Sequence, residues 1–211
     1  MAYDNSVFIN CPFDDKFAPL LEAMIFCVVR AGLTPRLATE RLEGGESRLD
    51  KIIELIGACR YSIHDLSLAY SSKVDEPFRM NMPFEFGLDL GRRRAPDPET
   101  NDKKFLVFER NHRELKPCLS DIDGFDIEHH KNDLTTLIEK VRNFLRIEAN
   151  RVLPGPAKIR GDYFTFLGWM TEKKIHEGHT EKEALKLPTQ ERLQEMAIWM
   201  KAEMPEEFTR A

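Results

Sequence analysis

The chain has 211 residues, of which 42% are hydrophobic and 32% charged, and its formal net charge is −5. This length and composition predict a globular protein with a sizeable core, and the acidic balance excludes a broad basic surface for nucleic acid. The four cysteines show no CxxC spacing, and no apolar run approaches the ~20 residues of a membrane span. We therefore expect a cytoplasmic protein without a bound metal, a disulfide framework or a membrane anchor.

The first part of the chain alternates between strand and helix patterns. Residues 6–10 (SVFIN) form a short β-rich run, and apolar residues at helical spacing follow over 17–29, with Gly32 as the stop signal. Residues 34–38 are predicted to form a second strand. A second amphipathic helix is predicted from Leu49 to Gly57.

The alternation continues in the middle of the chain. Residues 61–66 (YSIHDL) are predicted to form a third strand, and a loop rich in Ser, Asp and Pro then leads to a helix over 81–91. Residues 104–108 and, more weakly, 124–128 are predicted as strands four and five. A closing helix is expected over 134–145.

This order of elements predicts the fold class. Strands that alternate with helices indicate an α/β fold with right-handed crossovers, here a flavodoxin-like, doubly wound, mostly parallel five-stranded sheet. The alternation stops at the Pro- and Gly-containing stretch 153–156. We therefore divide the chain into an α/β domain over 1–150 and a small helical C-terminal extension over 151–211, which is expected to dock on the main domain or on a partner.

Ligands of open α/β sheets bind beyond the carboxyl ends of the strands. This rule selects the segments 10–15 and 64–67 and the start of the helix at Asn81. The first segment (NCPFDD) contains no glycine, which excludes the phosphate loops of dinucleotide-binding and P-loop proteins. Asn10, at the tip of the first strand, is well placed to hold a substrate hydroxyl or amide.

The helix over 81–91 (NMPFEFGLDLG) carries the main catalytic candidate. Asn81 is the predicted N-cap, and four-residue spacing aligns it with Glu85 and Asp89 in a polar line between two apolar flanks. Burial would raise the pKa of Glu85, whereas the helix N-terminus would lower it, a tension typical of catalytic carboxylates. The alternative is that the polar line is the solvated face of a surface helix, and the sequence leaves both interpretations open.

His64 and Asp65 end the third strand. Neighbouring residues of a strand face opposite ways, so one of the two can point into a shared cleft. We favour Asp65 as the residue that faces the ligand, and we expect His64 to be a packed histidine.

These features together resemble the nucleoside 2-deoxyribosyltransferase superfamily and the related Toll/interleukin-1 receptor (TIR) domains of bacterial defence systems. The resemblance covers about residues 6–148 and rests on the layout and on MPFEFG. It implies that Glu85 is the carboxylate that attacks or stabilises the anomeric carbon of an N-glycosidic bond. By the same resemblance, Asp65 holds ribose hydroxyls, and Asn10 and Phe13 line the base or sugar pocket.

The remaining assignments complete this hypothesis. Asn81 and Met82, beside Glu85, are assigned to substrate binding, and Asp89 or His64 could donate a proton to a departing purine or pyrimidine. Nicotinamide needs little acid assistance, so a single glutamate could suffice for NAD.

The expected function is cleavage of an N-glycosidic bond in a nucleotide, either NAD or a nucleoside 5′-phosphate, in a role that includes phage defence. NAD enters as a substrate and no cofactor is expected. The expected partners are a nucleotide or nucleoside and further copies of the chain, with neither a membrane nor nucleic acid. Two alternatives remain: a non-catalytic nucleotide sensor, and an interaction protein that assembles through its helical tail.

Overall fold

The computed structural model describes residues 3–41, 43–68, 80–95 and 102–209. The chain divides into two compact units, Met1–Arg151 and Val152–Ala211. Most of the loop expected before Asn81, residues 69–79, lies outside the described residues.

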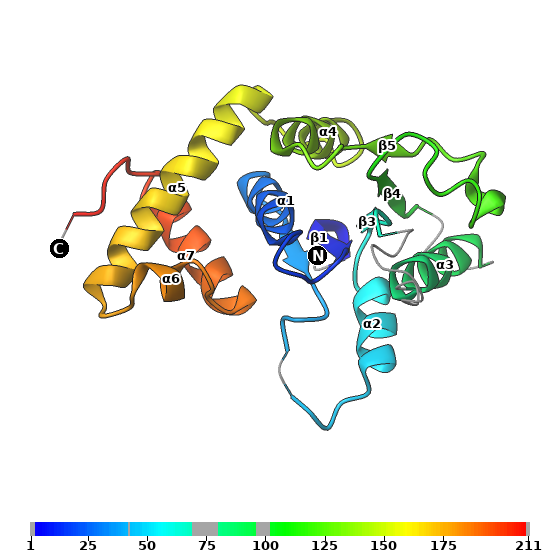
Figure 1. Ribbon diagram of the computed structural model, residues 1–211, viewed down its shortest axis with the longest axis horizontal. Coiled ribbons are helices and arrows are strands. Elements are labelled where there is room, and N and C mark those ends of the chain that lie inside the picture. The colour runs from blue at the N-terminus through cyan, green and yellow to red at the C-terminus, as the bar shows by residue number, and fades with distance from the viewer. Residues whose placement is uncertain (1–2, 42, 69–79, 96–101, 210–211) are drawn as a thin grey trace. The chain divides into compact units, whose positions relative to one another are not determined.

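The first unit is built on one parallel sheet of five strands (Figure 1). Its order, β2-β1-β3-β4-β5, is the flavodoxin-like order, so the predicted fold class is confirmed. All four strand pairs are parallel, and Asn10 lies beside His64 in the register of β1 and β3. The strands are β1 (Ser6–Asn10), β2 (Thr34–Arg36), β3 (Tyr61–Asp65), β4 (Lys104–Glu109) and β5 (Glu128–His129).

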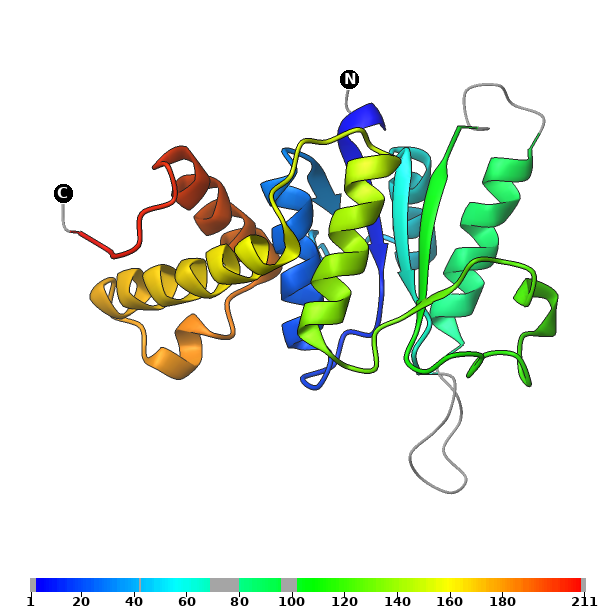
Figure 2. The same ribbon diagram turned by 90° about the horizontal axis from the view of Figure 1, so that it is seen from above.

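Helices cover both faces of this sheet, as Figures 1 and 2 show: α1 and α4 lie on one face, and α2 and α3 on the other. Most of the apolar positions that predicted α1 and α4 are buried by the helices, including Met24 and Val28 in α1 and Leu137 and Val141 in α4. The helices of this unit are α1 (Ala18–Arg30), α2 (Arg48–Gly57), α3 (Asn81–Arg94) and α4 (Leu134–Ile147).

The two edge strands differ most from the prediction, whereas the central strand β3 ends only one residue early. The strand expected over 34–38 ends at Arg36, and Pro35, which lacks an N–H, is tolerated because β2 lies at the edge. The strand expected over 124–128 is instead the two-residue strand Glu128–His129, which shares only Glu128 with the predicted range. Phe125 and Ile127, which gave the strand pattern, instead pack against the cluster that contains Met82 and Phe86.

The ends of α3 also differ from the prediction. Met80 occupies the N-cap position without a side-chain hydrogen bond, so Asn81 is the first helical residue and not the cap. The helix continues past Gly91 to Arg94. Its last turn contains Arg92, Arg93 and Arg94, whose positive charges complement the helix dipole.

The second unit contains three helices around a small core of its own. Phe166 and Trp199 pack with their ring centroids 5.6 Å apart, and Lys174 forms a 2.8 Å ion pair with Glu195. A capping box at Thr180 begins the shortest helix. The helices are α5 (Pro156–His176), α6 (Glu181–Ala184) and α7 (Thr189–Lys201).

Candidate functional site

A cavity of about 320 Å³ lies where β1 ends and α2 and α3 begin, at the carboxyl edge of the sheet. This is the edge at which ligands bind in folds of this class. It brings together five of the seven residues that the sequence predicted for the site. The lining residues are Asn10, Cys11, Phe13, Arg48, Asn81, Met82 and Glu85.

Glu85 is the carboxylate of this cavity. Its side chain projects from the first turns of α3, and the residue is 5% exposed. Burial raises the pKa of Glu85 to about 7, although the positive charge of Arg48 partly opposes that increase. The polar line of α3 therefore faces inward at Glu85, and the alternative of a fully solvated helix face does not hold there.

Asn10 is held in one orientation by two acceptors. Its amide nitrogen donates to the backbone oxygen of Met82 at 2.9 Å and lies 3.1 Å from Nδ1 of His64. Since an amide NH₂ donates only, Nδ1 of His64 must accept this hydrogen bond. Both amide hydrogens are then used, and the carbonyl oxygen of Asn10 is left to accept a hydrogen bond from a ligand hydroxyl.

A buried charged cluster lies behind Asn10. Nε2 of His64 carries the proton and donates to Oδ2 of Asp89 at 3.1 Å, and the Ser62 hydroxyl donates to the same oxygen at 2.5 Å. Lys103 approaches Oδ1 of Asp89 at 3.0 Å. Burial would raise the pKa of Asp89, but the hydrogen bonds and the charge of Lys103 outweigh it and lower that pKa.

Asp89 therefore differs from its expected role. It is fully buried, does not line the cavity, and is held ionised by its neighbours, so it has no proton to donate to a leaving group. Its contacts fix His64, which in turn fixes Asn10. We assign Asp89 a positioning role through this chain of hydrogen bonds.

Asp65 also lies outside the cavity lining. It faces the opposite side of β3 from His64, where it pairs with Nε2 of His130 at 3.1 Å. It also accepts hydrogen bonds from the backbone N–H and the hydroxyl of Ser67. These contacts hold Ser67 directly after β3, and Asp65 is not among the residues that line the cavity of Glu85.

Cys11 lines the cavity but is not a poised nucleophile. The residue is 1% exposed, and burial together with the negative charges of Asp65 and Glu85 raises the pKa of its thiol well above the ordinary value. The nucleophilic form of cysteine is the thiolate, which is disfavoured here. Glu85 therefore remains the one candidate nucleophile among the lining side chains.

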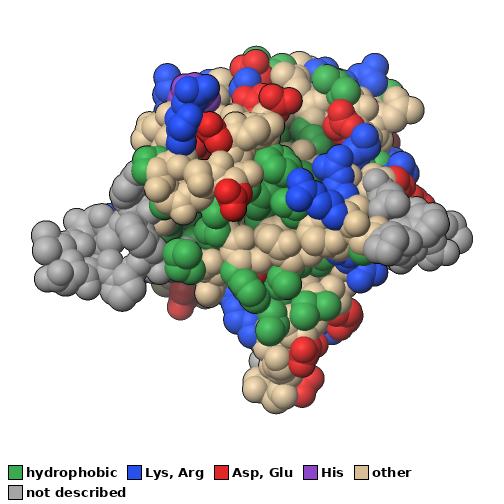
Figure 3. Space-filling view, turned by 90° about the vertical axis from the view of Figure 1, so that its right-hand side faces the viewer, with side chains coloured by type: hydrophobic (Ala, Val, Ile, Leu, Met, Phe, Trp, Pro, Cys, Tyr) green, Lys and Arg blue, Asp and Glu red, His purple; other side chains and the backbone are tan. Residues whose placement is uncertain are grey.

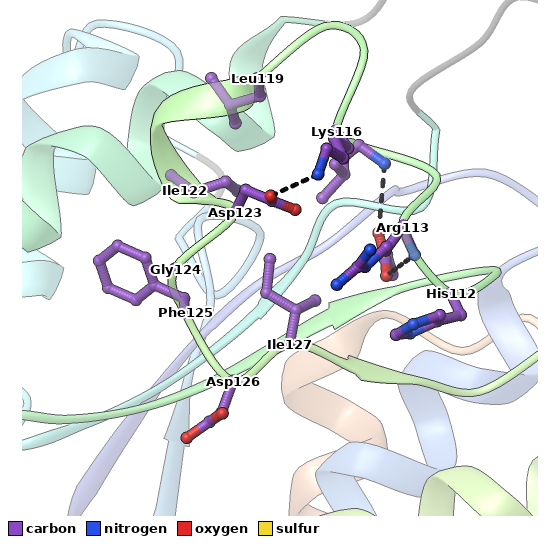
Figure 4. A pocket seen from close by; sticks show the side chains of 12 residues that line it. His112, Arg113, Lys116, Leu119, Ile122, Asp123, Gly124, Phe125, Asp126 and Ile127 are labelled. Atoms are coloured by element: carbon purple, nitrogen blue, oxygen red, sulfur yellow. Dashed lines mark hydrogen bonds and ion pairs between the residues drawn. The ribbon is translucent and has the colours of Figure 1, made fainter.

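A second cavity, of about 290 Å³, is formed by the segment between β4 and β5 (Figure 4). Its charged groups are largely matched within the protein: the Glu109 carboxylate accepts from the backbone N–H groups of Arg113 and Leu115, and Lys116 pairs with Asp123 at 2.7 Å. Glu109 is also a buried acid, but its carboxylate is already occupied by these two backbone donors. We therefore take the cavity of Glu85 as the candidate site.

Sequence reasoning missed Arg48 and Lys103. The sequence did contain a signal for Arg48. This residue begins the helix that follows β2, and in this class of fold the helix after a strand begins at the carboxyl edge of the sheet, where ligands bind. The sequence contains no such signal for Lys103. It directly precedes β4 and is followed by a second lysine, Lys104, whose side chain is 43% exposed, and the sequence does not show which of the two is buried.

Comparison of the chain with protein-family models, with curated proteins and with solved structures finds no match. Within the described ranges, no group of three or more His, Cys, Asp or Glu side chains is arranged to hold a metal ion. In the same ranges, no helix combines the length and the apolar character needed to cross a membrane.

The raised pKa of Glu85 predicts a pH-dependent effect on stability. A carboxyl group whose pKa is higher in the folded state binds more protons when folded, so stability is lost as the pH rises from the ordinary value of 4.5 to about 7, and the loss is complete above that range. We expect Glu85→Gln to increase the free energy of unfolding at pH 8.5 by about 1–2 kcal/mol, a figure reduced from the full shift because solvent at the cavity screens the charge. At pH 5, close to the ordinary pKa of a glutamate, the difference should be about a quarter of that value.

Denaturant unfolding at both pH values measures this effect. Glu139→Gln, which changes an exposed glutamate of α4, is the matched control and should show no such difference. An equal effect of Glu85→Gln at pH 5 and pH 8.5 would show that ionisation of Glu85 does not oppose folding.

Proposed function

We propose that this protein cleaves the N-glycosidic bond of a nucleotide, with Glu85 as the catalytic carboxylate. The observation that carries the proposal is a buried acid with a raised pKa that lines a cavity at the carboxyl edge of the sheet. The resemblance of the sequence to nucleoside deoxyribosyltransferases and TIR domains supports the same chemistry and extends the proposal to a role in phage defence.

The proposed reaction proceeds through a state in which positive charge develops on the sugar. The bond between the anomeric carbon and the base nitrogen breaks, and its electron pair leaves with the base. The Glu85 carboxylate stabilises the resulting oxocarbenium-like sugar or traps it as an ester. Water then adds to the anomeric carbon, so that NAD and water give ADP-ribose, nicotinamide and one proton.

The other cavity residues have roles in holding the substrate. Phe13 is 38% exposed and offers an aromatic face for a base, and the carbonyl oxygen of Asn10 can accept from a sugar hydroxyl. Asn81 and Met82 complete the wall beside Glu85. Asp89 and His64, the residues predicted to protonate a leaving purine or pyrimidine, are buried outside the cavity lining, which favours a substrate such as NAD whose base leaves readily.

Assembly into a homo-oligomer is part of the proposal. Leu49 and Ile53 on α2 are exposed at four-residue spacing, as are Met80 and Phe84 at the start of α3. In the view of Figure 3, hydrophobic side chains gather over the middle of the surface beside a group of Lys and Arg side chains. Exposed apolar side chains of this kind are typical of interaction surfaces, so activity should be assayed over a range of protein concentrations.

Release of free base tests the proposal. We expect the protein to release base from NAD or from a nucleoside 5′-monophosphate, measured by chromatography. Because the ionised form of Glu85 is the reactive one, kcat/KM should fall about tenfold per pH unit below about pH 7 and level off above it.

The outcomes separate the alternatives. Binding of a nucleotide without release of base would indicate a sensor, and neither binding nor release at any protein concentration would indicate an interaction protein. Activity that instead declines as the pH rises above 7 would contradict the role of Glu85 as an ionised carboxylate.

A further inference from the structure

Arg48 is the positively charged residue of the cavity lining, and its charge acts on Glu85 across the cavity. It is the first residue of α2, is exposed, and lines the same cavity as Glu85. Among the described residues, no carboxylate forms an ion pair with it.

The neighbouring arginines differ in this respect. Arg36 pairs with Glu40 at 2.6 Å, and Arg41 pairs with both Glu46 at 3.2 Å and Glu54 at 3.0 Å. The segment between β2 and α2 thus supplies carboxylates to two arginines and leaves the guanidinium of Arg48 available at the cavity.

The charge balance of the cavity favours an anionic ligand. Five of the lining side chains are neutral, including the Cys11 thiol, whose pKa is raised by burial. Glu85 is the one lining carboxyl group, and with a pKa raised to about 7 it carries only part of its negative charge near neutral pH, whereas Arg48 is always positive. A guanidinium offers paired N–H donors that match phosphate oxygens, and such charge-assisted bonds are strong.

We propose that Arg48 binds a phosphate group of the ligand and makes the cavity selective for nucleotides over nucleosides. This inference rests on the proposed function for the identity of the ligand, because it assumes that a sugar and base occupy the cavity beside Glu85. It adds a residue that selects the phosphorylated form of the substrate and that takes no part in the bond cleavage.

Binding to a catalytically silent protein tests the inference independently of turnover. In the Glu85→Gln background, titration calorimetry compares the four common ribonucleoside 5′-monophosphates and NAD with the corresponding nucleosides. We expect the best phosphorylated ligand to bind at least tenfold more tightly than its nucleoside. Adding Arg48→Gln should weaken binding of that ligand by about 10- to 100-fold and leave the affinity for the nucleoside unchanged.

Two further variants make the result specific. Arg41→Gln removes the same charge from the preceding segment at a residue that does not line the cavity, and it should leave both affinities unchanged. Arg48→Lys keeps the charge without the paired donors and should restore part of the phosphate preference. Since Arg48 is exposed, an unchanged thermal midpoint for Arg48→Gln is the expected check that folding is intact.

The outcomes for this inference and for the proposed function are distinguishable. If the preference for phosphorylated ligands depends on Arg48 but the wild-type protein releases no base, the role of Arg48 is supported and the proposed glycosidase activity is contradicted. If base is released equally from nucleoside and nucleotide, and Arg48→Gln does not change the rate, the proposed glycosidase activity is supported and the role of Arg48 is overturned. Failure of every phosphorylated ligand to bind would also overturn it.

Discussion

Replacement of Glu85 by glutamine is expected to lower base release by about 10³-fold or more, the scale on which loss of a catalytic nucleophile acts. The amide keeps the size of the side chain and its hydrogen-bonding atoms, so the cavity should retain its shape. It carries no negative charge to stabilise a developing oxocarbenium ion and cannot form an ester with the anomeric carbon. Initial rates measured with a substrate that the wild-type protein accepts provide the comparison.

The interpretation depends on separating the loss of chemistry from the loss of binding. Affinity for the substrate should stay within a few-fold of the wild-type value, and Glu139→Gln should retain full activity because it alters an exposed carboxylate on α4. A folded Glu85→Gln protein that keeps more than about a tenth of the wild-type rate would exclude Glu85 as the catalytic carboxylate. The proposed function would then lose its central residue.

Much of the fold follows from local patterns in the sequence. The helical spacing of apolar residues located α1, α2 and α4 because each buries one face against the sheet. The prediction located the ends of the edge strands β2 and β5 poorly. Each of these strands pairs with only one neighbour, so few backbone hydrogen bonds stabilise an extended conformation there. At β5, packing of Phe125 and Ile127 on the cluster beneath α3 took precedence over strand pairing.

The sequence predicted those residues of the candidate site whose position follows from where the strands end. Asn10 and Glu85 come to one cavity because β1 and α3 meet at the carboxyl edge. The assignment of Asp65 required knowing which face of β3 lies toward α3, and strand periodicity cannot decide that. Its partner His130 is 65 residues away along the chain, and the partner of Asp89 is one of two adjacent lysines that the sequence does not distinguish.

The buried ion pair behind the cavity predicts the largest effect on stability. Nζ of Lys103 lies 3.0 Å from Oδ1 of Asp89, and both side chains are fully buried. Lys103 also donates to the backbone oxygens of Ile56 at 2.8 Å and Cys59 at 2.5 Å, near the end of α2. One ammonium group therefore joins α3 to the end of α2 and compensates the charge of Asp89.

We expect Lys103→Met to reduce the free energy of unfolding by about 3–5 kcal/mol, because methionine fills a similar volume but leaves a buried carboxylate without its compensating charge. Lys104→Met is the matched control: its side chain is 43% exposed and pairs with Glu148 at 3.2 Å, so its loss should cost no more than about 1 kcal/mol. Denaturant unfolding of the two variants at pH 7 makes the comparison. Equal stabilities would mean that Asp89 does not need Lys103, and that His64 and Ser62 alone can hold its charge in the core.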